Sequence, residues 1–194
     1  MKDRLLSIED LRCERDGRQL FTGLNLSVEA GECVALLGPN GSGKSTLLRC
    51  VTGFFPDYEG TIQVAELAYL GHRPGIAAGL SALENLRWYA GLAGVDGGNL
   101  SALLERVGLA GYDHILAGRL SAGQQRRVAL ARLMLDRAPL WLLDEPFTAL
   151  DTDGVDLVRA LLVAHLNGGG AALCATHQAL EVAGSSVLDL GAGR

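Results

Sequence analysis

The sequence lacks any apolar run of about 18 residues, the length that a membrane-spanning helix needs. Its most apolar region, residues 128–143, is interrupted by Arg132, Asp136 and Pro139. The first four residues, Met1-Lys2-Asp3-Arg4, lead into a short mixed segment and not into the apolar core of a signal peptide. We therefore expect a protein that stays in the cytoplasm.

Basic clusters are also missing. The chain has 17 Lys and Arg residues against 22 Asp and Glu residues, which gives a formal net charge of −5. A protein whose main partner is nucleic acid usually carries a basic patch. We therefore expect no nucleic-acid partner.

Cysteine-based and guanine-reading motifs are absent as well. The four cysteines never form a C-x-x-C pair, and three lie in or beside apolar segments, so buried free thiols are expected (Cys13, Cys33, Cys50 and Cys174). There is no C-x-x-C-H haem motif, so nothing in the composition points to haem. The lack of an Asn-Lys-x-Asp motif disfavours a GTPase.

The sequence does contain Gly38-Pro39-Asn40-Gly41-Ser42-Gly43-Lys44-Ser45, which matches the phosphate-binding loop G-x-x-x-x-G-K-S. An apolar run of strand length, residues 33–37, precedes it, and residues 46–51 follow with helical spacing. A glycine-rich turn is the alternative, but the flanks favour a phosphate site made by loop N–H groups and a helix N-terminus. Lys44 would reach the outer phosphates, and the Ser45 hydroxyl would bind Mg²⁺.

The remaining pattern indicates an α/β fold. Residues 3–30 resemble paired strands with a turn at Asp16-Gly17. Further along, apolar strands alternate with helices, which implies a mainly parallel sheet with sites at the strand C-termini. The expected strands are 61–64, 67–70, 140–143 and 171–175, and the expected helical regions are 81–117, 120–135 and 153–166. No linker or repeat divides the chain, so one domain, 1–194, is expected.

Two of these strands end in reactive side chains. Asp144 and Glu145 follow one apolar strand, and His177 follows another. A buried acidic pair is costly unless cations neutralise it, which a magnesium–phosphate complex would do. Asp144 would hold the metal, Glu145 would act as general base on the attacking water, and His177 would hydrogen-bond the γ-phosphate. Acidic helix caps and a structural histidine are the alternatives.

The order of these motifs, with Ser121-Ala122-Gly123-Gln124 and Asp151, resembles the ABC-type ATPase family. By itself, Ser121 to Gln124 is a helix capping box. The resemblance implies that Gly38 to Thr46 wraps the triphosphate of ATP. It also implies that Ser121, Gly123 and Gln124 close on ATP held by another subunit, with Asp151 at the shared interface. The chain would then act as a homodimer or with a partner domain.

The resemblance also implies a fold. It is the P-loop NTPase fold, in which a mainly parallel sheet flanked by helices carries an N-terminal antiparallel β-subdomain. A small helical subdomain would span approximately residues 73–135. The whole chain would form a single ATP-binding domain of this type.

Two positions depart from the common family pattern. The loop after residues 67–70 usually carries a glutamine that touches magnesium and the attacking water, and here His72 stands at that position. An imidazole can still hydrogen-bond but titrates near neutrality. An aromatic residue usually stacks on adenine near residue 15, and Arg15 is found instead, whose guanidinium could stack on the base.

Several segments are similar to one subfamily, the ATP-binding subunits of the haem exporters of cytochrome c biogenesis, which shares the histidine at position 72. The segments are 69–76, 80–86, 120–127, 145–151 and 176–178. This implies a peripheral subunit on the cytoplasmic face of the bacterial inner membrane, bound to integral-membrane permease subunits. Its ATP hydrolysis would drive release of a haem-loaded chaperone. Another ABC exporter is the alternative. A soluble ABC-type ATPase acting on ribosomes or DNA would normally have two ATPase halves.

Overall fold

The computed structural model describes residues 3–191. Within them the chain divides into two compact units. The sheet unit contains residues 3–69, 138–146 and 161–191, and the helical unit contains residues 70–137 and 147–160. The range predicted for a helical subdomain, 73–135, lies inside the helical unit.

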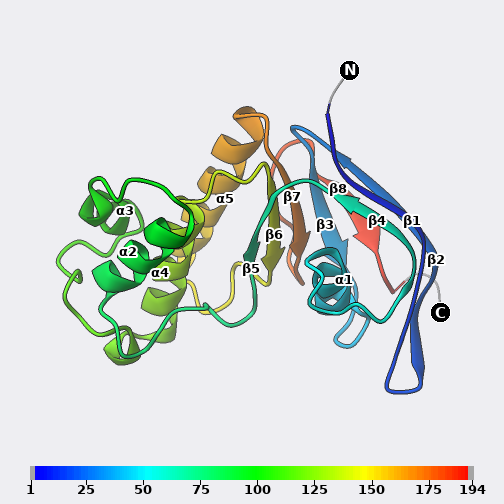
Figure 1. The fold of residues 1–194 in the computed structure, drawn as a ribbon, viewed down its shortest axis with the longest axis horizontal. Helices are drawn as coiled ribbons and strands as arrows, with labels where there is room; N and C mark the ends of the chain where they lie inside the picture. Colours follow the sequence, from blue (N-terminus) through cyan, green and yellow to red (C-terminus); the bar gives the residue numbers. More distant parts are fainter. Residues whose placement is uncertain (1–2, 192–194) are drawn as a thin grey trace. The chain divides into compact units, whose positions relative to one another are not determined.

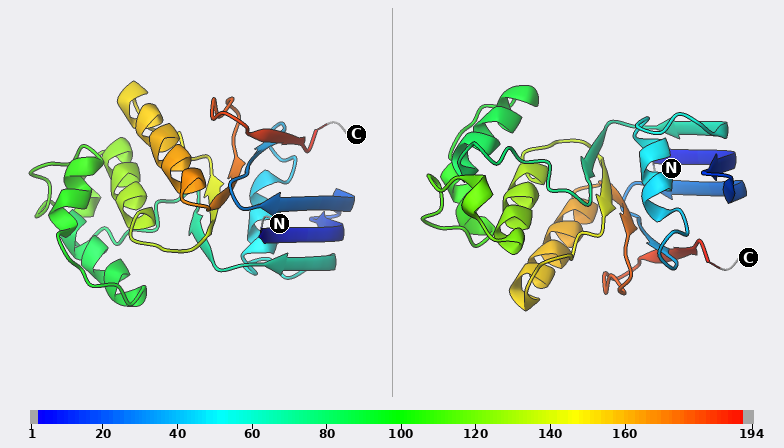
Figure 2. Two further views of the ribbon diagram at one scale, coloured as in Figure 1. Left: turned by 90° about the horizontal axis from the view of Figure 1, so that it is seen from above. Right: turned by 90° about the horizontal axis from the view of Figure 1, so that it is seen from below.

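An antiparallel sheet of three strands opens the sheet unit, in the order β2-β1-β4. Its strands are β1 (Arg4–Arg15), β2 (Arg18–Glu29) and β4 (Glu59–Val64), and they lie side by side in both views of Figure 2. The predicted turn is present, since Asp16 and Gly17 both have positive φ, as a tight hairpin requires. Strand β2 continues through Thr22-Gly23, because the pairing with β1 absorbs the irregularity there as a register shift.

The second sheet has five strands in the order β5-β6-β7-β3-β8. They are β5 (Leu67–Leu70), β6 (Leu140–Asp144), β7 (Ala171–Ala175), β3 (Cys33–Leu37) and β8 (Ser186–Asp189). The pairs β3–β7, β6–β7 and β3–β8 are parallel, and every residue of β6 and β7 is buried. The predicted fold class is therefore confirmed. Strand β8 was not predicted, because its short, largely exposed sequence carries no apolar run.

Helix α1 (Lys44–Val51) packs against β6 and β7 and fixes the phosphate loop on the sheet. Leu47 and Leu48 on this helix are fully buried in one cluster with Leu36, Leu142 and other strand residues. Burying each leucine contributes about 1.5–3 kcal/mol. All four cysteines are buried and free, as predicted.

The helical unit contains α2 (Ala82–Leu92), α3 (Leu100–Arg106) and α4 (Ala122–Leu133), which pack on one another, and a 3₁₀ turn (Ala117–Arg119) before α4. Helix α5 (Thr152–Asn167) begins in this unit and ends in the sheet unit. The capping box predicted at Ser81 and Glu84 starts α2, with both reciprocal hydrogen bonds present. In the described part of the chain, no helix combines the length and the apolar character that a membrane crossing requires.

Candidate functional site

The loop between β3 and α1 is shaped by glycines. Gly43, with φ of 104°, is the N-cap of α1, and no side chain among residues 3–191 caps that helix. A Cβ at Gly43 would lie 2.7 Å from the ring of Phe21, and one at Gly38 would lie 2.6 Å from Ser42 Oγ. Larger residues are therefore excluded at both positions. The first N–H groups of α1 can therefore donate hydrogen bonds to a bound anion.

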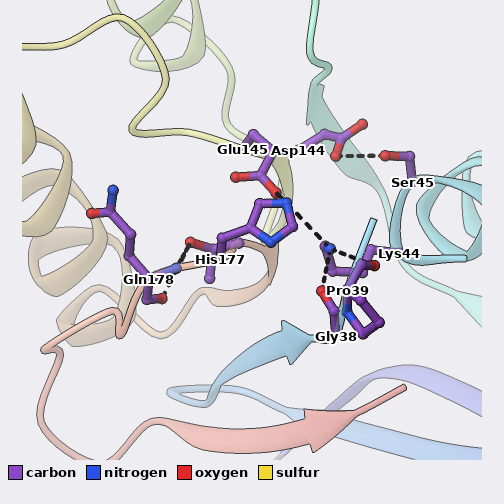
Figure 3. A network of polar contacts seen from close by, with 9 residues as sticks. Gly38, Pro39, Lys44, Ser45, Asp144, Glu145, His177 and Gln178 are labelled. Atoms are coloured by element: carbon purple, nitrogen blue, oxygen red, sulfur yellow. Dashed lines mark hydrogen bonds and ion pairs between the residues drawn. The ribbon is translucent and has the colours of Figure 1, made fainter. Parts of the chain in front are cut away.

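The Lys44 side chain lies over this loop and is largely buried. Its Nζ donates to the carbonyl of Gly38 at 2.7 Å and of Pro39 at 3.4 Å, and it lies 3.5 Å from His177 Nε2 (Figure 3). Ser42 Oγ is also buried and has no hydrogen-bond partner among the described residues. A buried cation beside an unsatisfied hydroxyl suits a bound phosphate, which would accept from both.

Two oxygen donors meet beside the loop. Ser45 Oγ donates to Asp144 Oδ1 at 2.9 Å, and Asp144, the last residue of β6, is 1% exposed (Figure 3). Hydroxyl and carboxylate oxygens are the donors that Mg²⁺ prefers. Within residues 3–191 no group of three or more His, Cys, Asp and Glu side chains could hold a metal. Mg²⁺ is usually held by one or two protein oxygens, with waters and phosphate oxygens as its other ligands, and the Ser45–Asp144 pair suits such an ion.

The next residue, Glu145, turns out of the sheet in an unusual conformation. Its φ of 50° lies in the left-handed region, which costs a non-glycine residue on the order of 1–3 kcal/mol. Its backbone N–H still donates to the carbonyl of Ala175 at 2.8 Å. Glu145 Oε1 lies 3.0 Å from His177 Nε2, so the imidazole nitrogen stands between the Glu145 carboxylate and the Lys44 ammonium (Figure 3). The strained backbone directs the carboxylate to the site.

Thr176 supports His177 from the preceding position and was not identified from the sequence. Its N–H donates to the carbonyl of Leu36 at 3.1 Å, and its buried hydroxyl accepts from the Gln178 N–H at 3.0 Å. The same hydroxyl donates to the carbonyl of Gln178 at 3.2 Å. A threonine in a strand-to-loop junction is too common to predict this role. Its contacts fix the backbone on both sides of His177.

Tyr69 was also missed, because it looks like an ordinary residue of strand β5. Burial and then the nearby charge of Asp144 raise the pKa of its hydroxyl, while Arg49 acts in the opposite direction. The one available signal is its position near the C-terminal end of β5, next to β6 in the sheet. Tyr69 therefore stays neutral beside the Asp144 carboxylate.

A second group of predicted residues lies in the helical unit, at the start of α4. Ser121 Oγ accepts from the Gln124 N–H at 3.2 Å, and Gln124 Oε1 accepts from the Ser121 N–H at 2.9 Å, which is a complete capping box. A Cβ at Gly123 would lie 2.6 Å from the carbonyl oxygen of Ala149. Only glycine lets the helix start approach this loop so closely.

Asp151 caps the following helix. Its Oδ1 accepts from the Gly154 N–H at 3.0 Å and from Arg127 Nη2 at 2.6 Å. The Arg127 hydrogen bond, and then that of the Gly154 N–H, hold the pKa of Asp151 below its ordinary value. Ser121, Gly123, Gln124 and Asp151 are thus brought together in one part of the helical unit.

The two positions that depart from the family pattern, Arg15 and His72, are both exposed. Arg15 ends β1, is exposed, and has its Nε 3.4 Å from Asp16 Oδ2. His72 is an exposed residue of the loop that follows β5, in the helical unit. Stacking of Arg15 on a base and contact of His72 with magnesium both stay predictions.

Comparison with known proteins decides the family. A family model described as ABC transporter matches residues 21–148, which is well over half of the chain. The chain belongs to the ABC transporter family. The predicted resemblance to ABC-type ATPases is confirmed, and the chain is a nucleotide-binding ATPase subunit of this family.

Curated relatives match along almost the whole chain. They include three proteins from different bacteria that are named cytochrome c biogenesis ATP-binding export protein CcmA. The protein of Methylococcus capsulatus is 46% identical over 95% of this chain and 96% of its own length. That of Escherichia coli K12 is 46% identical over 94% of both chains, and that of Saccharophagus degradans is 44% identical over 94% and 92%.

Solved structures agree in fold. An ATP-binding protein from Pyrococcus furiosus, described as an ABC transporter, is 27% identical, covers 95% of this chain and 96% of its own, and gives a TM-score of 0.83. An ATP-binding subunit of an ABC transporter is 25% identical, covers 89% of this chain and 79% of its own, and gives 0.81. Both confirm the predicted P-loop NTPase fold.

Proposed function

We propose that this chain is the ATP-hydrolysing subunit of an ABC transporter complex of cytochrome c biogenesis. Its hydrolysis of ATP would be coupled to haem export, through release of a haem-loaded chaperone. The observation that carries this proposal is the 44–46% identity, over more than nine tenths of both chains, to proteins named for ATP-binding export in cytochrome c biogenesis.

Residues 38–46 would bind the nucleotide. The N–H groups of the glycine loop and of the first turn of α1 would surround the phosphates, since these groups are fixed by backbone geometry. Lys44 would exchange its hydrogen bond to the Gly38 carbonyl for one to an outer phosphate. Ser42 would donate from its buried hydroxyl. Arg15 would stack on the base.

Hydrolysis requires a general base for the attacking water and a hydrogen-bond donor to the charged oxygens of the γ-phosphate. Glu145 would orient the attacking water and accept its proton, and His177, 3.0 Å from that carboxylate, would donate to the γ-phosphate. Mg²⁺ held by Ser45 and Asp144 would neutralise charge on the phosphate oxygens. His72 would contact the metal or the water in place of the usual glutamine.

The second half of the site would come from another copy of the chain. Ser121, Gly123 and Gln124 would close on ATP bound to the partner copy, and Asp151 would lie at the shared interface. In support, the start of α4 is exposed at Ser121 and Ala122, and Asp151 is exposed as well. An isolated monomer should therefore hydrolyse ATP poorly.

Integral-membrane permease subunits would be the other partners, with the chain bound peripherally at the cytoplasmic face of the inner membrane. The segment from His72 to Leu92 is proposed to contact them. Trp88 and Leu92 support this, because they lie one turn apart on α2 and are 55% and 66% exposed, so that they form an adjacent pair of large apolar residues on the surface.

The test is complementation of cytochrome c maturation in a strain that lacks the corresponding subunit. The unaltered chain should restore holocytochrome c, measured by haem staining. The Lys44→Ala and Glu145→Gln variants, expressed to the same level, should not. If the unaltered chain fails despite good expression and intact ATPase activity, it serves another exporter.

A further inference from the structure

Arg127 joins three elements of the helical unit through one guanidinium. It lies on α4, four residues after Gly123, and its side chain is only 14% exposed. Nη1 donates to the carbonyl of Val107, the C-cap of α3, at 2.8 Å. Nη2 donates to Asp151 Oδ1 at 2.6 Å. The end of α3, the body of α4 and the loop before α5 therefore share one cation.

The end of α3 is shaped to admit this side chain. Gly108 has φ of 76°, and a Cβ there would lie 2.8 Å from Arg127 Nη1. The carbonyl that accepts from Arg127 is at the negative end of the α3 dipole, where a cation is stabilised. Arginine suits the position because a planar fork can serve two acceptors at once, and a lysine cannot do so with the same geometry.

The other end of the contact fixes the loop that carries Asp151. Because Asp151 Oδ1 also accepts from the Gly154 N–H, the carboxylate is held both by α5 and by Arg127. A second contact acts independently at the start of α4, where Gly123 lies against the Ala149 carbonyl. The first turn of α4 and the loop 149–151 are thus fixed to each other at two points.

We propose that Arg127 is a positioning residue for the shared ATP site. By tying α4 to Asp151, it holds Ser121, Gly123 and Asp151 in one arrangement, so that they meet the ATP of a second copy together. The inference rests on the shared site proposed above. Loss of Arg127 should weaken ATP-dependent pairing of two copies and leave ATP binding to the Lys44 loop unchanged.

The test uses the Glu145→Gln protein, in which ATP should bind but be hydrolysed far more slowly, so that an ATP-bound dimer would accumulate. Light scattering over a range of protein concentrations, at saturating ATP, gives the dimer dissociation constant. Adding Arg127→Ala should raise this constant roughly tenfold or more, since it removes a charge-paired, largely buried side chain. Adding Arg127→Lys should restore only part of the loss.

The matched control is Arg159→Ala. Arg159 also pairs with an aspartate in the helical unit, at 3.3 Å, but that aspartate, Asp156, lies on α5 and not in the 121–123 or 149–151 segments. This variant should leave the dimer constant unchanged. Binding of a fluorescent ATP analogue at low protein concentration should differ less than about twofold between all variants, a limit well below a tenfold effect.

The outcomes separate the two proposals. A Glu145→Gln protein that stays monomeric with ATP contradicts the shared site itself. If it dimerises and Arg127→Ala dimerises equally well, the role of Arg127 is wrong and the shared site stands. If Arg127→Ala does not fold, Asp151→Asn replaces it. Its amide oxygen keeps the cap of α5 while the ion pair is lost, so unchanged dimerisation in that variant also contradicts the inference.

Discussion

Two helix starts in this molecule are both proposed to bind ATP phosphates, yet they are built differently. Helix α1 begins at Gly43 with no side-chain cap among the described residues. Helix α4 begins at Ser121 with a complete capping box, because Ser121 and Gln124 satisfy each other's backbone N–H groups. The first start leaves its N–H groups for a ligand, and the second satisfies two of its own.

This difference explains how the α1 start and the α4 start can contribute unequally to binding one ATP. An uncapped start with a buried lysine can bind a triphosphate alone. A capped start gains little from a phosphate, except through the Ser121 hydroxyl, which accepts from Gln124 N–H and can still donate its own proton. The α4 start therefore suits a late, weaker contact to ATP that is already bound elsewhere.

Changing Glu145→Gln should have the largest effect, because it removes the base and leaves both helix starts intact. Turnover of ATP should fall by about 10²–10⁴-fold, the usual contribution of a general base. Nucleotide binding, measured by equilibrium dialysis, should be retained. Near-normal phosphate release by this variant would remove Glu145 from its proposed role.

Changing Lys44→Ala removes the buried cation at the start of α1. Affinity for ATP should fall on the order of a hundredfold, since hydrogen bonds to a charged group contribute about 1.5–3 kcal/mol each. Binding to the monomer can be followed with a fluorescent nucleotide analogue. Ser121→Ala, measured in parallel, should bind as the unaltered protein does. Equal affinity of the Lys44→Ala protein would contradict the assignment of the phosphate loop.

The first start could be predicted in detail because its information is local. The eight residues 38–45, with an apolar strand before and a helix after, encode their own geometry. The contact between Ser45 and Asp144 followed from the general rule that strand ends meet at one sheet edge. The pairing of Glu145 with His177 belongs to the same edge, although the positive φ of Glu145 has no signature in the sequence.

The support of the second start could not be predicted, because it depends on contacts between distant residues. Arg127 belongs to a polar run on a helix, and nothing nearby indicates that it reaches Val107 and Asp151, 20 and 24 positions away. Strand β8 was missed for a related reason, since it is ordered by pairing with β3 and has little apolar character of its own.

Replacing Ser121 by alanine tests the second start against a matched control. Ser81 forms the same capping box on α2, with Glu84 in place of Gln124. Each alanine variant should lose about 0.5–2 kcal/mol of unfolding free energy, the usual cost of a lost N-cap. Only Ser121→Ala should also weaken ATP-dependent dimerisation and turnover. If both variants lose turnover equally, the effect is one of stability, and Ser121 has no separate role at the nucleotide.

Acid should weaken the contact between Arg127 and Asp151, beside the start of α4, and this should have a small effect on thermal stability. The pKa of Asp151 is held below its ordinary value of 3.8, first by the hydrogen bond from Arg127. A lowered pKa in the folded state stabilises the fold fully above the ordinary value, and this contribution is lost as the pH falls through the lower, folded-state value.

The thermal midpoints of the unaltered protein and of Asp151→Asn should therefore differ by a constant amount from neutral pH down to about 4. Below that pH the difference should shrink, because the Asp151 carboxylate becomes neutral as its replacement already is. Other carboxylates titrate in both proteins and cancel in the difference. A gap that keeps its full size into the lowest pH range would show that the Arg127 contact does not depend on the charge of Asp151.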